Sequence, residues 1–153
     1  MAVETPTPRS VAVHAENMDT RSWMDIFAGA PGPVAEGLGL QTQWQGPLAM
    51  VRSKIPFSHF NMVLTLGCPA PMDDAAFATI DRFYAEGGVD KHWIMVVGEC
   101  EPRDLGSRLV ARGYQSAGAW DRVVMHGTRP DVWASLGQDC ELVTGANAEE
   151  WRS

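Results

Sequence analysis

The chain has 153 residues, of which 45% are hydrophobic and 20% charged, as is typical of a globular domain with a core of ordinary size. The net charge is −7, and the Lys and Arg residues are scattered, which disfavours a nucleic-acid or anionic-membrane partner because both need a concentrated basic surface. No apolar run approaches the roughly 20 residues that a membrane span requires, and the polar, proline-containing N-terminus does not read as a signal peptide.

The cysteines and histidines indicate neither a disulfide framework nor a metal site. Cys68, Cys100 and Cys140 are odd in number and widely spaced, and the four histidines lack the short spacings of metal ligands. This cysteine usage fits a protein of the reducing cytoplasm.

The first part of the chain is predicted to be a leader followed by one helix. Residues 1–10 are expected to form a flexible leader, and Val11 and Val13 alternate with small or polar neighbours, which favours a short edge strand. Residues 17–27 place apolar side chains on one helical face, and Gly29 ends that helix.

Three strands are then expected. Residues 40–45 alternate apolar and polar side chains, as in a half-exposed antiparallel strand, and 48–52 return after a Gly46-Pro47 turn. Residues 60–66 are more continuously apolar, which is typical of a strand covered on both faces.

An amphipathic helix follows this buried strand. Asp73 or Asp74 can cap its N-terminus, and Gly87-Gly88 end it. The side chains at helical spacing on its inner face are Ala76, Phe77, Ile80, Phe83 and Tyr84.

The later elements continue the alternation of strand and helix. Residues 93–97 are expected to form a buried strand, a second helix starts at Pro102 and is closed by Gly113, and 120–125 form a further strand. This order predicts an α/β (α+β mixed) domain with a central mixed, mostly antiparallel sheet and helices on both faces.

The last residues read as the opening of another domain. Residues 141–144 are typical of a strand, and a helix starts near 146 but has only about one turn before Ser153. We therefore expect three parts: the leader at 1–10, a domain at 11–137, and the start of a second, absent repeat at 138–153.

In order and spacing, five segments together resemble a GNAT-type N-acetyltransferase domain, namely the N-terminal lobe of bacterial proteins with two such domains in tandem. The segments are FNMVLTLG (60–67), IDRFYAEGG (80–88), WIMVV (93–97), DLGSRLVARGY (104–114) and AWDRVV (119–124). The resemblance implies that Gly113 makes a left-handed turn and that Tyr114 fills the core.

The resemblance also implies acetyl-CoA as the family's cofactor, held by a Q/R-x-x-G-x-G/A loop whose backbone N–H groups bind the pyrophosphate. The matching residues are 67–74, where Pro69 and Pro71 lack an N–H and where Asp73 and Asp74 add negative charge. We therefore expect that this lobe does not bind acetyl-CoA in the usual way. The candidate cofactor contacts that remain are Leu66, Gly67 and Cys68.

Acid–base chemistry has two candidates. Glu99 follows the strand at 93–97, where a family carboxylate can act through water as the base, and Tyr114 is a candidate general acid. The alternatives are a helix-capping role for Glu101, which precedes Pro102, and a core position for Tyr114. A covalent role for Cys100 or Cys68 would need a nearby base and a lowered pKa, and the sequence indicates neither.

Two residues are candidates for a substrate cleft. Asn61 is polar within an apolar strand, so it either fixes an irregular strand edge or contacts a ligand. Trp44 lies among glutamines on the hairpin and, if exposed, would mark a contact with a ligand or a second lobe. His59 is interpreted as a solvated loop histidine, with a general base as the alternative, and His92 and His126 as surface residues.

Three functions follow. The first is an N-terminal GNAT-like lobe of an acetyl-CoA-dependent N-acetyltransferase, not catalytic by itself, that supports the fold and the substrate side. Its partners would be a second GNAT lobe or a homodimer partner, with a small-molecule or peptide amine as acceptor. The alternative is a non-enzymatic binding or dimerisation module, and the third is an active single-domain acetyltransferase.

Overall fold

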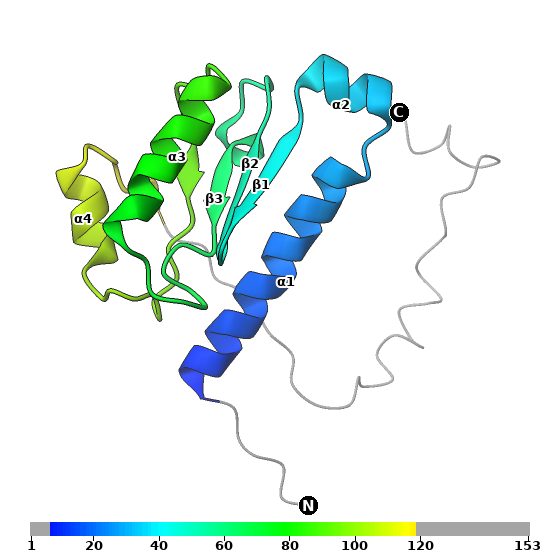
Figure 1. Cartoon of the computed structure of the whole chain (residues 1–153). Coiled ribbons are helices and arrows are strands. Elements are labelled where there is room, and N and C mark those ends of the chain that lie inside the picture. The colour runs from blue at the N-terminus through cyan, green and yellow to red at the C-terminus, as the bar shows by residue number, and fades with distance from the viewer. Residues whose placement is uncertain (1–6, 119–153) are drawn as a thin grey trace, which may run out of the picture. The chain divides into compact units, whose positions relative to one another are not determined.

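The computed structural model describes residues 7–118, which form a mixed α/β arrangement of helices around one sheet (Figure 1). The elements in chain order are α1 (Pro8–Ala28), α2 (Gly32–Leu38), β1 (Gln41–Gln45), β2 (Leu48–Arg52), a 3₁₀ turn (Ser58–Phe60), β3 (Met62–Leu64), α3 (Asp74–Glu86), β4 (Trp93–Ile94) and α4 (Leu105–Ala111). No helix within the described residues combines the length and apolar character needed to cross a bilayer.

The sheet of the described part has the strand order β1-β2-β3-β4. The pairs β1–β2 and β2–β3 are antiparallel, and β3 and β4 are parallel and joined through α3. The predicted fold class, a mixed and mostly antiparallel sheet, is therefore confirmed.

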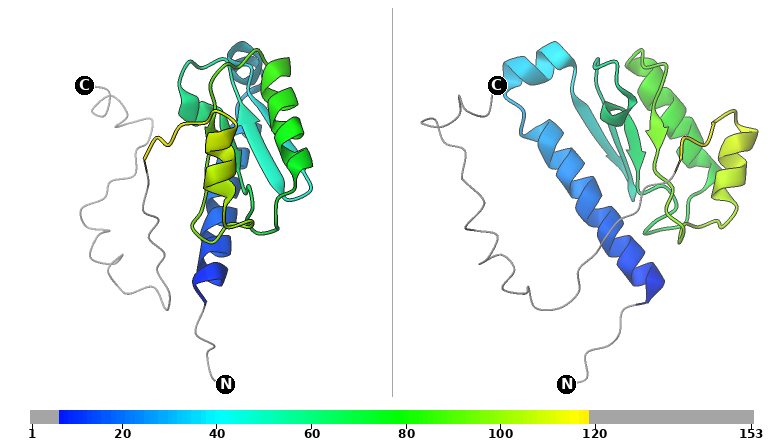
Figure 2. Two further views of the ribbon diagram at one scale, coloured as in Figure 1. Left: turned by 90° about the vertical axis from the view of Figure 1, so that its left-hand side faces the viewer. Right: turned by 180° about the vertical axis from the view of Figure 1, so that it is seen from behind.

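Helices cover both faces of the sheet, as the sequence predicted (Figure 2). Helix α1 packs on one face, and α3 and α4 pack on the other. The α1 face buries Met24, Phe27, Ala49, Val51, Met62 and Leu64. The opposite face buries Leu48, Met50, Val63, Leu66, Phe77, Ile80, Phe83, Tyr84, Leu105 and Leu109, among others.

Helix α3 forms as its sequence predicts. Asp73 is the N-cap, and its Oδ1 accepts the Ala76 N–H at 3.0 Å. Gly87 ends the helix. Its apolar stripe, with Phe77, Ile80 and their neighbours one turn later, is buried against the sheet.

Helix α1 corrects the predicted edge strand at Val11 and Val13, which are helical. Thr7 caps the helix because its side chain accepts the Ser10 N–H at 3.1 Å, and Pro8 follows in the first turn. The helix thus begins within the range expected to be a leader. The alternation of Val11 and Val13 covers only two side chains, whereas the helix gains a cap and a long buried face. That face contains Glu16, Thr20, Met24 and Phe27.

Other differences concern length. Strand β4 has only two half-buried residues, so the expected buried strand at 93–97 is wrong in extent. Helix α4 begins at Leu105 instead of Pro102, and α2 was not expected.

Gly113 has φ +93°, which confirms the left-handed turn there. The strand expected at 120–125 and the segment at 138–153 lie outside the described residues.

Candidate functional site at the carboxyl ends of β3 and β4

The candidate site is the chain between β3 and α3, residues 65–73, here called the junction loop. The loop opens at Thr65, which has a φ of +62° that side chains other than glycine rarely adopt. The Thr65 hydroxyl accepts the Ala49 N–H at 3.0 Å and donates to the Pro47 carbonyl, while the Thr65 N–H donates to the buried Glu16 carboxylate at 2.7 Å. These three bonds hold the strained backbone in place.

The junction loop is joined directly to the segment that follows β4, residues 98–104. The Glu101 N–H donates to the Gly67 carbonyl at 2.8 Å, and the Glu101 carbonyl accepts the Met72 N–H at 2.9 Å. Gly67 has φ +75°, and a Cβ there would lie 2.7 Å from the Glu101 carbonyl oxygen. The loop glycine is therefore used for close packing of backbone on backbone.

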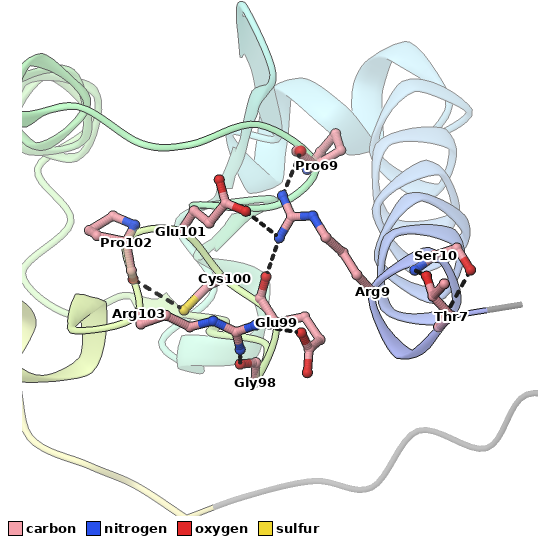
Figure 3. Close-up of polar contacts among 10 residues, drawn as sticks. All are labelled: Thr7, Arg9, Ser10, Pro69, Gly98, Glu99, Cys100, Glu101, Pro102 and Arg103. Carbon is pink, nitrogen blue, oxygen red and sulfur yellow. Dashed lines mark hydrogen bonds and ion pairs between the residues drawn. The ribbon is translucent and has the colours of Figure 1, made fainter.

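Arg9, from the first turn of α1, braces both segments (Figure 3). Its guanidinium donates to the Glu99 carbonyl at 2.6 Å and to the Pro69 carbonyl at 3.3 Å, and it forms an ion pair with the Glu101 carboxylate at 3.0 Å. One side chain thus links the N-terminus of α1 to the chain after β3 and to the chain after β4.

Three backbone donors of the junction loop, those of Thr65, Cys68 and Met72, are bonded to acceptors within the protein. The Cys68 N–H donates to the Thr65 carbonyl and the Met72 N–H to Glu101, whereas Pro69 and Pro71 have no donor. Of the predicted cofactor contacts, Leu66 is 2% and Cys68 is 1% exposed, and Gly67 lies against Glu101. A phosphate cradle needs several convergent N–H groups, and these donors do not provide them.

A small cleft of about 230 Å³ lies between the β1–β2 turn, the junction loop and the first turns of α3. Its polar lining comes from Gln45, Thr65, Asp73 and Thr79, and none of the described residues that line it is basic. The cleft is smaller than the roughly 300–1,000 Å³ typical of small-molecule pockets. It can accept a small neutral or cationic group more readily than a phosphate.

The predicted acid–base residue Glu99 is half-buried in the segment after β4 and does not line the cleft. Its carboxylate pairs with Arg103 at 2.8 Å, four residues further along the chain. Cys100 is buried, and burial raises the pKa of its thiol, which keeps the sulfur protonated and poorly nucleophilic. No cluster of three or more potential metal ligands occurs among residues 7–118.

The structure does not bring Tyr114 to the same site. Tyr114 lies at the opposite end of β4, where its hydroxyl is 2.9 Å from His92 Nε2. The His92 ring stacks on Tyr84 with 3.9 Å between ring centroids, and the Tyr84 hydroxyl donates to the Val51 carbonyl at 3.1 Å. Burial lowers the pKa of the His92 imidazole to about 4. Burial also raises the pKa of the Tyr84 and Tyr114 hydroxyls.

The two predicted cleft residues lie apart from the junction loop. Asn61 is 4% exposed, and its amide accepts the Ser53 N–H at 2.7 Å and donates to the Ile55 carbonyl at 3.3 Å, which matches the alternative of fixing an irregular strand edge. Trp44 is 52% exposed on β1, as its position among glutamines suggested. A role for either residue in substrate binding stays a prediction.

Sequence reasoning missed two residues that organise the site, Arg9 and Glu16. Arg9 fell within the expected leader, and nothing local indicates that it reaches segments 60 and 90 residues away. Glu16 carried a usable signal, because it shares a helical face with Thr20, Met24 and Phe27, and a carboxylate on an apolar face needs a partner.

Comparison with known proteins assigns no family. The chain matches no protein-family model, and no curated protein or solved structure matches it at a significant level. The GNAT resemblance therefore rests on the motifs and on the order of elements.

Proposed function

We propose that this chain is a GNAT-like lobe of an acetyl-CoA-dependent N-acetyltransferase that does not itself hold acetyl-CoA in the family's usual way. The order of the described elements supports this proposal: three antiparallel strands, then a helix, then a parallel strand. The lobe would support the fold and form part of the substrate side.

The observation that carries the proposal is the closure of the junction loop. Gly67 packs against the Glu101 carbonyl, and the Met72 N–H donates to that same carbonyl. A pyrophosphate at this position would have to displace these contacts, and each lost buried hydrogen bond costs about 1 kcal/mol net.

The charges at the N-terminus of α3 support the same conclusion. The helix dipole favours an anion at this end, but the Asp73 carboxylate already occupies the cap, and Asp74 follows in the first turn. Arg9, which donates to the Pro69 carbonyl of the loop, is paired with Glu101, and Arg108 lies 3.9 Å from the Asp74 carboxylate. The carboxylate in the cleft suits a small amine, which is the chemistry of an acceptor.

The acetyl transfer itself would belong to another lobe or to a partner chain. Glu99 is paired with Arg103, and Tyr114 contacts His92 at the far end of β4, so the two predicted catalytic residues do not form one site. Neither of the described cysteines, Cys68 and Cys100, forms a disulfide, which fits the cytoplasm as the proposed compartment.

A turnover assay tests the proposal. The full chain is incubated with acetyl-CoA and a panel of primary amines and peptides, and the release of free CoA is measured. We expect no release above the blank. Release that rises in proportion to the chain concentration would overturn the proposal and favour an active single-domain enzyme.

A further inference from the structure

We propose that the outer edge of β1 is a self-association surface, at which a second copy of this chain adds its own β1 in antiparallel pairing. The two-fold axis would pass beside Gln43. This inference does not depend on the acetyltransferase proposal, because it rests on the backbone and the side chains of the hairpin.

The direction of the β1 backbone groups follows from two hydrogen bonds of β2. The Ala49 N–H donates to Thr65 and the Ser53 N–H to Asn61, so the odd-numbered residues of β2 point their backbone groups toward β3. The even-numbered residues of β2 therefore bond to β1. Since Trp44 lies opposite Ala49 and backbone direction alternates, Thr42 and Trp44 point their N–H and C=O groups away from the sheet.

Within residues 7–118 these outward groups face a sheet edge, because β1 is the terminal strand. Native edge strands are usually protected by Pro, by a charge, by a bulge or by being very short. Strand β1 has none of these features: it pairs with β2 in unbroken register over five residues, and its sequence QTQWQ is uncharged. The other edge strand, β4, has only two residues.

The edge is complementary to itself. In an antiparallel pair centred on Gln43, Thr42 of one copy lies opposite Trp44 of the other, and each such pair exchanges two N–H···O bonds. All the outward groups of Thr42 and Trp44 would then be satisfied in both copies, as an isologous contact requires.

The side chains favour the same register. Thr42 and Trp44 project from the same face of β1, so each exposed Trp44 ring would cover the partner's Thr42. A Trp side chain can bury about 150–250 Å², which makes it the anchor of this contact. Gln43 would lie opposite its own copy without charge repulsion.

A charge-swap experiment tests the proposal. The full chain and its Gln43→Lys and Gln43→Glu variants are compared by sedimentation equilibrium. We expect the wild type to dimerise reversibly and each variant to bind itself about tenfold or more weakly, because like charges meet at the two-fold axis. Mixing the two variants should restore a dimer, since Lys then faces Glu.

Two controls keep the result specific to β1. Gln45→Lys places its charge opposite a neutral Gln41, so it should reduce dimerisation less than Gln43→Lys does. Thr42→Pro removes an outward N–H that β2 does not use, so it should abolish the dimer while circular dichroism shows a folded chain. A wild type that stays monomeric at its highest soluble concentration, or a dimer that both Gln43 variants leave unchanged, would overturn the proposal.

Discussion

At the carboxyl ends of β3 and β4 the chain is held by backbone hydrogen bonds and the Arg9–Glu101 ion pair, whereas at their amino ends it is held by stacked rings. The carboxyl end contains Gly67 and the small cleft, with a capped helix beside them. The amino end contains the stacked rings of Tyr84 and His92, with Tyr114 bonded to the histidine.

The two ends also differ in their chemistry. Ligand sites of α/β proteins lie at the carboxyl ends of strands, yet His92 and Tyr84, whose pKa values are the most displaced among the described residues, lie at the amino end. At the amino end, burial is the main cause of both pKa displacements, and no ligand is needed to explain them. A strand-to-helix junction in the position where ligands often bind therefore need not carry the chemistry that binds them.

Substitution of Gly67 is expected to have the largest effect. Gly67→Ala would place a Cβ 2.7 Å from the Glu101 carbonyl and would also be strained at φ +75°, so we expect a loss of about 2–4 kcal/mol in the free energy of unfolding. Urea denaturation measures this loss. Gly88→Ala is the matched control, because its φ is +63° but nothing lies within 4 Å, and it should cost about 1 kcal/mol. Equal losses would show that Gly67 does not pack closely.

Glu16 tests how the junction loop is held from the α1 side. Glu16→Ala removes the acceptor of the Thr65 N–H and should cost about 2 kcal/mol, since it leaves a donor buried without that bond. Glu16→Gln keeps an acceptor oxygen and should retain most of the stability. If the two variants lose the same free energy of unfolding, the negative charge of Glu16 stabilises the fold and its hydrogen bond to the Thr65 N–H does not.

His92 tests the amino end through pH. Its pKa is lowered to about 4 in the folded chain, against about 6.5 for an unperturbed histidine, so the unfolded chain binds the proton more readily between these values. The His92 contribution to stability should therefore be fully present above pH 6.5 and fall by on the order of 1–2 kcal/mol toward pH 4, allowing for partial exposure.

The matched variant for this pH dependence is His92→Phe, which keeps a ring against Tyr84. Urea denaturation at pH 7 and at pH 4.5 should show a smaller loss on acidification for the variant than for the wild type. Identical losses would mean that His92 titrates normally in the folded chain.

Arg9 should have the smallest effect on global stability, about 1 kcal/mol for Arg9→Ala, because its ion pair is partly exposed. The effect should concentrate in the loops, so hydrogen exchange at the Met72 and Glu101 amides should become faster. Arg103→Ala removes the ion pair with Glu99 and the hydrogen bond to the Gly98 carbonyl, which are both local to the segment after β4, and should leave the Met72 amide unchanged. Unchanged exchange in Arg9→Ala would contradict the bracing role.

The fold was predictable where local signals and burial agree. The hairpin followed from alternation around Gly46-Pro47, and α3 followed from the Asp73 cap and its apolar stripe. Strand β4 was predicted too long because WIMVV is apolar throughout, although its pairing with β3 covers only Trp93 and Ile94.

The site was predictable in position and only partly in detail. The missing N–H groups of Pro69 and Pro71 can be counted in the sequence. The contact of Gly67 with Glu101 cannot, because it depends on how two loops 34 residues apart in sequence meet in space. The bracing by Arg9 is likewise a tertiary contact that no local pattern encodes.

The measurement that tests the central claim most directly is a calorimetric titration of the full chain with acetyl-CoA. A closed junction loop with two prolines and a capped helix N-terminus predicts no saturable heat at micromolar concentrations of the ligand. Saturable micromolar binding that free CoA competes away would contradict the account, because the pyrophosphate would then be bound by a loop whose Met72 N–H is already bonded to the Glu101 carbonyl and whose two prolines have no N–H.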